Sequence, residues 1–248
     1  MGRNDDLRVP CAAVLIEFDD RESDSPYVER IWRSRSRRGG SFLSMAEGNI
    51  ELVFTRLPEF LAVTLRGPVT RGTVVECPPN GEWLAIRFRL GTYLPQIPTS
   101  ALIDHQNMQL PVLANGRFLF SDLTWEIPSY DSAEHLVARL ARAGVIARSH
   151  ATDAAVDGDV DWMSQRSVQR HFRRATGMTF TSYQQIQRAR RAAALLVGGS
   201  SVLEATNGAG YFDQAHLTRS VRQLIGMTPA RLAREQPQLS FSYKTTTS

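Results

Sequence analysis

Two segments in the C-terminal third of the chain predict helices that carry an apolar face opposite a face of arginine and glutamine. The first segment, residues 165–175, follows Ser164 at an N-cap position and precedes Gly177, a residue type that commonly ends helices. At 100° per residue its inner side consists of Val168, Phe172 and Ala175, and its outer side of Arg166, Gln169, Arg170 and Arg173. Arginine forms paired hydrogen bonds with guanine and glutamine forms them with adenine, and both side chains also bind phosphates, so this side suits the major groove of DNA.

The second segment repeats this pattern further along the chain. Gly210 and Asp213 mark its start, and Gly226 with Pro229 marks its end. Its inner side consists of Leu217, Val221 and Leu224, and its outer side of His216, Arg219, Ser220 and Gln223, with Gln214 near the N-terminus and Arg222 on the flank. Between the two segments, residues 181–197 predict a helix with a broad apolar face on which both units can pack. That helix would set the separation of about 34 Å that successive major grooves require.

The charge distribution supports a polyanionic partner for this part of the chain. Residues 162–234 contain 11 arginines, one glutamate and one aspartate, a net charge of +9, whereas the whole chain carries +4, so the remainder carries −5. A basic segment joined to a mildly acidic one is typical of a nucleic-acid-binding domain attached to a domain with another function. A bias toward arginine codons would explain the near absence of lysine, but not the scarcity of acidic residues here.

Residues 8–123 predict a β-rich fold. Short runs of β-branched and aromatic residues alternate with glycine and proline, a pattern typical of an antiparallel sheet or a small barrel. In one such run, Leu84, Ile86, Phe88 and Leu90 fall on one face and Arg87 and Arg89 on the other, which predicts a half-buried strand. Short helices are expected at residues 26–33 and 99–106. The basic run at 33–38 is expected to be a solvated loop, with contact to an anionic effector or to DNA as the alternative.

The fold class is therefore expected to be α+β, with an N-terminal antiparallel sheet or small barrel followed by an all-α double helix-turn-helix domain. We place the β-rich domain at residues 1–130 and the double helix-turn-helix domain at 131–236, with a leading helix at 131–144. Residues 147–160 predict a weak helix or a loop. The polar residues 237–248 are expected to form a disordered tail.

Several other classes of protein are disfavoured. The sequence contains no apolar run of about 18 residues and no secretory signal, so we expect a cytoplasmic protein without a membrane span. Cys11 and Cys77 cannot supply a four-thiolate zinc site and are expected to be inert buried thiols. Asp104 and His105 are too few for a metal site. No nucleophile elbow, phosphate-cradling glycine loop or HExxH pair occurs, so no catalytic residue, cofactor or metal is predicted. The aromatic residues Trp83, Tyr93, His105 and Trp125 could line a pocket, but such residues more often form core.

The two segments and the helix between them resemble the AraC/XylS family of bacterial transcription regulators over residues 160–232. The matching residues are Ser164, Arg170, Phe172, Gly177, Tyr183, Arg188, Ala192, Leu195, Leu196, Gly210, Asp213, Gln214, Arg219, Gly226, Thr228 and Pro229. By this resemblance, bases or phosphates would be contacted by Gln165, Arg166, Gln169 and Arg170, and by Gln214, His216 and Arg219. Arg173, Arg222 and Gln223 complete the predicted DNA-binding residues. The chain departs from the family at Ala205, Thr206, Tyr211, Leu217 and Val221, and the first unit's leading helix, expected at 156–162, is barely recognisable.

The resemblance also implies that the N-terminal domain binds a small-molecule effector, forms a homodimer, or does both. The expected partners are double-stranded DNA, an effector, a second copy of the chain and, for an activator, RNA polymerase. We therefore predict a sequence-specific transcription regulator that is not an enzyme. The alternative is an enzyme or DNA-repair protein with an appended DNA-binding domain, although a cysteine-based repair protein would need more thiolates than two. An RNA-binding or architectural protein would lack a preference for one duplex sequence.

Overall fold

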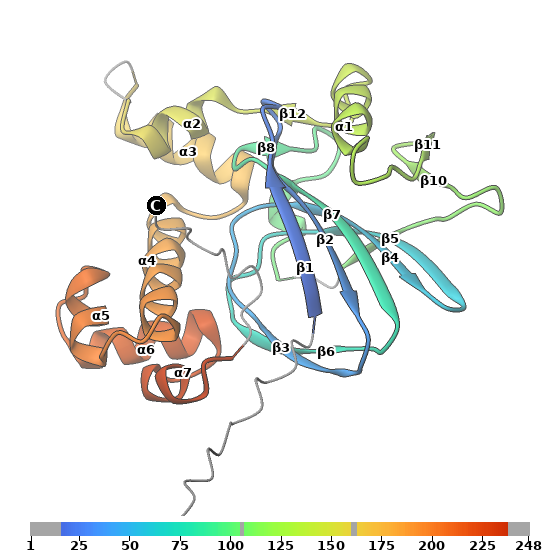
Figure 1. Cartoon of the computed structure of the whole chain (residues 1–248). Helices are drawn as coiled ribbons and strands as arrows, with labels where there is room; N and C mark the ends of the chain where they lie inside the picture. Colours follow the sequence, from blue (N-terminus) through green and yellow to red (C-terminus); the bar gives the residue numbers. More distant parts are fainter. Residues whose placement is uncertain (1–15, 105–106, 160–162, 238–248) are drawn as a thin grey trace, which may run out of the picture.

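The computed structural model describes residues 16–104, 107–159 and 163–237, and its largest element is an antiparallel sheet of six strands (Figure 1). In order across the sheet, the strands are β1 (Ile16–Glu22), β2 (Val28–Ser36), β7 (Gly81–Phe88), β4 (Glu51–Leu57), β5 (Phe60–Arg66) and β9 (Met108–Leu110). Three two-stranded ribbons pair β3 (Gly40–Ser44) with β6 (Thr73–Cys77), β8 (Thr92–Tyr93) with β12 (Ala147–Arg148), and β10 (Arg117–Phe120) with β11 (Leu123–Glu126). The predicted order, a β-rich N-terminal part followed by helices, is confirmed.

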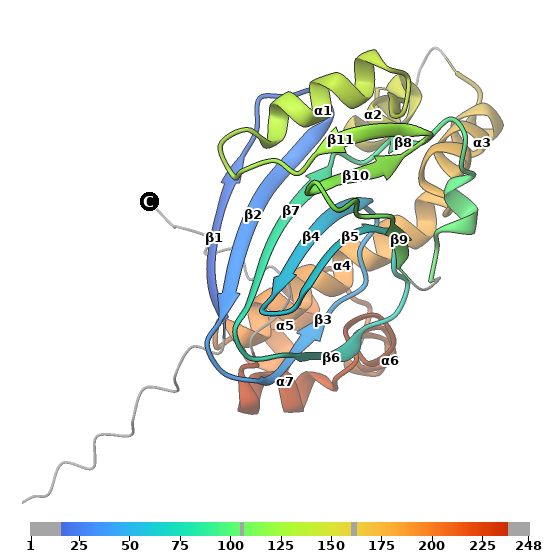
Figure 2. The same cartoon turned by 90° about the vertical axis from the view of Figure 1, so that its right-hand side faces the viewer.

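One face of the sheet carries its own hydrophobic core, beneath helix α1 (Ala133–Arg142) and the β10–β11 ribbon (Figure 2). Phe54 and Phe118 meet there edge to face, with ring centroids 5.7 Å apart. Trp125 is buried in this core and donates from Nε1 to the carbonyl of Phe120 at 3.0 Å. Leu136 and the other apolar residues of α1 belong to the same core, so this helix packs with the sheet. The division of the chain between residues 130 and 131 stays a prediction.

The two short helices expected in the N-terminal part are not formed as predicted. Residues 26–33 contribute to strand β2, in which Ile31 and Trp32 are both buried, one on each face of the sheet. A strand covered on both faces lacks the alternation of apolar and polar residues by which strands are recognised, and this explains the error. Of the helix expected at 99–106, the structure has one turn of 3₁₀ helix, η1 (Thr99–Ala101), and residues 105 and 106 lie outside the described residues.

Six helices form the rest of the described chain. They are α2 (His150–Asp157), α3 (Gln165–Thr176), α4 (Phe180–Val197), α5 (Val202–Gly208), α6 (Gln214–Ile225) and α7 (Pro229–Glu235). Helix α2 lies within residues 147–160, which were expected to be a weak helix or a loop, and it packs on α3. The leading helix of the first unit was expected at 156–162, but α2 begins at His150 and ends at Asp157, and residues 160–162 lie outside the described residues. Helix α4 lies between α3 on one side and α5 and α6 on the other (Figure 1).

The sheet and the helices are joined by a shared core. Leu43, Met45 and Ala46 pack into the hydrophobic cluster of the helices, and the amide of Ala46 donates to the carbonyl of Leu224 at 2.8 Å. Arg87 lies beside this junction and pairs with Glu47, the residue after Ala46. Its side chain is only 1% exposed, so the expectation of a solvated face is wrong for this residue. On the second face of strand β7, Ala85 packs in a small cluster with Trp32 and Val53. Leu84, Ile86 and Phe88 point to the other core as predicted, but Leu90, expected on their face, follows the end of the strand and packs against the cluster of the helices.

Candidate DNA-binding interface

Helix α3 begins and ends at the residues that the sequence indicated. The Ser164 hydroxyl accepts a hydrogen bond from the amide of Ser167 at 3.2 Å and so satisfies a free N–H of the first turn. At the other end, Gly177 adopts a φ of 76° and donates to the carbonyl of Arg173 at 2.8 Å. That left-handed conformation favours glycine, so the local sequence sets the length of this helix.

The two faces of α3 separate as the periodicity predicted. Phe172 is fully buried and packs against the rings of Phe180 and Tyr183, with centroids 5.1 and 5.8 Å away. The predicted DNA-binding residues of this helix, Gln165, Arg166, Gln169, Arg170 and Arg173, are all exposed. Arg174 is also exposed at the same end of the helix, although the sequence analysis did not select it. Its position in an arginine-rich last turn was the signal that could have found it.

The second unit, α5 and α6, has its own pair of caps. Ser201 and Glu204 form a capping box at the start of α5, and the hydrogen bonds from Ser201 hold the pKa of the Glu204 carboxyl below its usual range. The Asp213 carboxylate accepts from the amide of His216 at 2.6 Å and begins α6. Gly226, at a φ of 91°, ends it. Each half of the candidate interface is therefore a short helix followed by a capped, amphipathic one.

Four of the five residues predicted on α6 are exposed, and the fifth is partly enclosed. The exposed residues are Gln214, Arg219, Arg222 and Gln223. His216 is half-buried, because its ring meets Tyr211 edge-on at a centroid distance of 5.1 Å. The Tyr211 hydroxyl is 2.9 Å from that of Ser220 and the Arg188 guanidinium lies over its ring, so the position of Tyr211 is fixed from both sides. Phe212, beside it, is 92% exposed and was not predicted as a site residue.

The arginines of these two faces are available to an anionic partner. Within the described residues, Arg166, Arg170, Arg173, Arg219 and Arg222 form no ion pair with a carboxylate. By contrast, Arg231 and Arg234 of α7 both bind Glu235 and thereby hold its pKa below the usual range. A surface with several unpaired guanidinium groups attracts phosphates.

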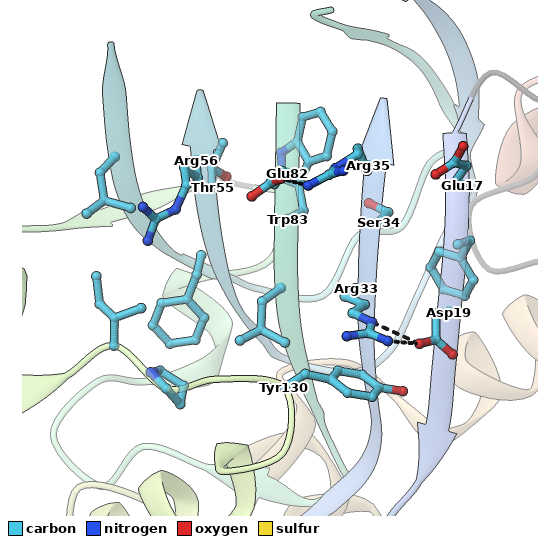
Figure 3. Close-up of a pocket in the computed structure, with 16 residues that line it drawn as sticks. Glu17, Asp19, Arg33, Ser34, Arg35, Thr55, Arg56, Glu82, Trp83 and Tyr130 are labelled. Atoms are coloured by element: carbon cyan, nitrogen blue, oxygen red, sulfur yellow. Dashed lines mark hydrogen bonds and ion pairs between the residues drawn. The ribbon is translucent and has the colours of Figure 1, made fainter. Parts of the chain in front are cut away.

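A second candidate site lies on the N-terminal sheet, in a pocket of about 540 Å³ (Figure 3). Its side chains come from neighbouring strands that carry alternating charges: Arg33 binds Asp19 at 2.7 Å, and Arg35 of β2 binds Glu82 of β7. The ring of Tyr130 lies 4.5 Å from the guanidinium carbon of Arg33 and closes one end. The basic run expected as a loop is therefore partly the end of strand β2, and three of its arginines, Arg33, Arg35 and Arg37, are paired with carboxylates.

The aromatic residues considered for a ligand pocket are distributed over different places. Trp83 lines the pocket on the sheet, whereas Trp125 is core and Tyr93 lies near α3. His105 and Cys11 lie outside the described residues. Cys77 is buried, and burial raises the pKa of its thiol. No group of three potential metal ligands occurs in the part of the chain that is described. Nor does that part contain a helix long and apolar enough to cross a membrane.

Comparison with known proteins gives a family match for the helical part of the chain. Residues 162–235 match the family model HTH_18, described as a helix-turn-helix domain. No curated protein sequence matches the chain. Two solved structures of ToxT from Vibrio cholerae are similar to it at 7% sequence identity. One covers 90% of this chain and 98% of its own with a TM-score of 0.40, and the apo form of a variant covers 89% and 97% with a TM-score of 0.36.

The family match, together with the two capped helix pairs, defines the class of protein. It is a DNA-binding transcription regulator, and its C-terminal part is a helix-turn-helix domain of the AraC type. The resemblance to the AraC/XylS family drawn from residues 160–232 is thereby confirmed for this part of the chain.

Proposed function

We propose that the protein reads a specific DNA sequence by placing α3 and α6 in successive major grooves. The observation that carries this proposal is the exposed, unpaired arginine and glutamine face on each of two capped helices that pack on α4. In helix-turn-helix proteins, the N-terminal residues of the recognition helix contact base edges. Gln165, Arg166 and Gln169 therefore read bases from α3, and Gln214 and Arg219 read them from α6.

The remaining predicted residues have supporting roles in this proposal. Arg170, Arg173 and Arg222 bind phosphates, because they lie further along their helices or on a flank. His216 is held by Tyr211 and reaches DNA only on the side of its ring that stays exposed. Such phosphate contacts fix the register of the protein on the duplex but carry no sequence information.

Selection of DNA from random duplexes by the purified protein is the direct test. We expect sequencing to show two short enriched segments whose centres lie about 10 base pairs apart, the spacing of successive major grooves. Selection without any enriched sequence would overturn the proposal. Enrichment of one segment alone would remove the second helix from it.

Substitution of the base-reading arginines gives a sharper test. Arg166→Ala and Arg219→Ala should each lose about 1–3 kcal/mol of preference at one base pair, as expected for a bidentate contact to guanine. Competition between the selected duplex and its single-base variants measures this loss. Arg142→Ala, at an exposed arginine of α1, is the matched control and should leave every preference unchanged. Equal losses on selected and random DNA would show that the residue contacts a phosphate.

We further propose that the pocket on the sheet takes a small-molecule effector that changes DNA binding. Its volume lies within the range of small-molecule sites, and Phe54, Leu61 and Leu84 give it an apolar part beside its charges. We also propose that the protein forms a homodimer, contacts RNA polymerase if it is an activator, is located in the cytoplasm and is not an enzyme.

A thermal-shift screen of small molecules, repeated with Leu84→Arg to fill the pocket, tests whether the pocket on the sheet binds an effector. A hit whose stabilisation survives this substitution would place the ligand elsewhere.

A further inference from the structure

A second groove, between the two parts of the chain, joins the recognition helix α3 to the N-terminal part. One wall consists of Arg170, Arg173 and Arg174, and the other of residues in the segment 93–100, which includes part of β8 and η1. Figure 1 shows α3 beside β8, and the volume of the groove is about 570 Å³. This groove is distinct from the pocket on the sheet.

The groove has walls that are held in place. Gly177, directly after α3, lies so close to the opposite segment that a Cβ there would come within 2.6 Å of Ile103 and 3.0 Å of the Ser100 amide nitrogen. The end of the helix and the segment are thus in close backbone contact. This contact fixes the position of the three arginines relative to the segment 93–100, so the groove between them has a defined shape.

The charge inside the groove is uncompensated. None of the three arginines has an ion pair among the described residues, and the described groove lining includes no carboxylate. Arg170 lies three and four positions before Arg173 and Arg174, an arrangement in which like charges destabilise a helix. The helix dipole favours the two arginines of the last turn but does not account for Arg170. In the pocket on the sheet, by contrast, Arg33 and Arg35 each meet a carboxylate.

The opposite wall adds a polar and an apolar part. Thr99 is 2% exposed, and its hydroxyl has no hydrogen-bond partner among the residues that the structure describes. A buried hydroxyl without a partner is unusual, and an oxygen-rich anion in the groove would accept a hydrogen bond from it once a small shift of η1 exposes the oxygen. Leu94, Pro95 and Ile97 provide an apolar surface beside these groups.

We propose that this groove binds a phosphate ester, held by the three guanidinium groups and the hydroxyl of Thr99. Guanidinium groups bind phosphate through paired hydrogen bonds, and the apolar wall suits the organic part of an ester better than a bare inorganic ion. The ester comes either from the DNA backbone next to α3 or from a free compound such as a nucleotide. Only the first source rests on the proposed DNA-binding function. In both cases the N-terminal part takes part in binding.

The test uses two ligands and three variants of the full chain. Adenosine 5′-monophosphate serves as the free phosphate ester in calorimetry without DNA, and the selected duplex is titrated at several salt concentrations. The variants are Arg174→Gln and Thr99→Val, one in each wall, with Arg142→Gln as control, because Arg142 is likewise an exposed arginine in the last turn of a helix. Thermal unfolding checks that each variant is folded.

Binding of the nucleotide that falls about tenfold or more in both wall variants, and stays unchanged in the control, would identify a free ester as the ligand. A salt slope for DNA that falls by about one in Arg174→Gln, together with weaker DNA binding at an unchanged slope in Thr99→Val, would identify the DNA backbone, because only the arginine carries a charge that displaces counterions. An effect of Thr99→Val cannot come from α3 alone. The proposal is overturned if neither quantity changes. In that case the proposed DNA-binding function is still tested separately by Arg166→Ala. Conversely, if the DNA selection fails, the nucleotide measurement still tests whether the groove binds a free phosphate ester.

Discussion

Replacement of Arg87 by methionine is expected to lower the free energy of unfolding by about 3–5 kcal/mol, the usual cost of removing one partner from a buried ion pair. Arg87 lies 2.9 Å from Glu51 and 3.0 Å from Glu47, and its side chain is 1% exposed. Glu47 also binds Arg190 of α4, whose guanidinium donates to the carbonyl of Ala46 at 3.1 Å. Methionine fills a similar volume but leaves the carboxylates without this counter-charge.

The buried ion cluster of Arg87, Glu51, Glu47 and Arg190 connects the sheet to helix α4, so its disruption is expected to destabilise both parts of the chain. Burial opposes ionisation of Glu47, but Arg87 and Arg190 outweigh it and hold the pKa of this carboxyl below its usual range. Burial raises the pKa of Tyr183, which is on the same helix as Arg190, to about 12, so its hydroxyl stays protonated at neutral pH. The neighbouring Glu29 has a pKa raised by burial, although Arg87 and Arg190 lower it in part.

The pH dependence separates this mechanism from a simple packing defect. A carboxyl whose pKa is lowered on folding contributes stability above its unfolded value, here 4.5, and loses it as the pH falls through the folded value. The difference in stability between the wild type and Arg87→Met should therefore be largest at neutral pH and shrink below about 4.5. Urea unfolding at several pH values measures this.

The control is Arg37→Met, which removes an ion pair with Glu17 at 2.8 Å. Both side chains are more than half exposed, at 76% and 54%, so solvent screens the pair and the expected loss is at most about 1 kcal/mol. A loss for Arg87→Met as small as that of the control, or one that does not change with pH, would contradict the role given to the buried cluster.

The sequence predicted the features of this protein that depend on neighbouring residues. Ser164 and Asp213 begin α3 and α6, and Gly177 and Gly226 end them, because caps and left-handed glycines act within one turn. The inner and outer faces followed from the same short-range periodicity. The exposed residues of the DNA-binding face could therefore be selected without the structure.

Features that depend on contacts between distant parts of the chain could not be predicted in this way. Arg87 looked like a solvated residue because the sequence does not show that Glu47 and α4 cover its side of the sheet. Strand β2 lacked alternation for the same reason. The groove beside Arg174 is formed by segments about 75 residues apart, and only folding brings them together.

The close contact between the sheet and α6 leads to the second large effect. The amide of Gly72 donates to the carbonyl of Gln223 at 3.3 Å, and a Cβ at Gly72 would lie 2.0 Å from the carbonyl carbon of Ile225. Gly226 approaches the same backbone from the other side, because a Cβ at Gly226 would lie 2.9 Å from the carbonyl oxygen of Gly72. Backbone atoms cannot rotate away as a flexible side chain can, so Gly72→Ala must push the loop between β5 and β6 away from the end of α6.

We expect Gly72→Ala to lower the free energy of unfolding by about 1–3 kcal/mol or more, as overpacking does in well-packed sites. Gly39→Ala is the matched control in the same part of the chain, because its Cβ would lie 3.4 Å from Pro79, which is an ordinary van der Waals contact. Hydrogen exchange locates the damage: the amides of Gly72 and Ala46, which bond to α6, should exchange faster in Gly72→Ala, while those inside α3 stay protected. Equal stability of the two variants, or faster exchange throughout α3, would show that the contact at Gly72 does not hold the sheet against the second recognition helix.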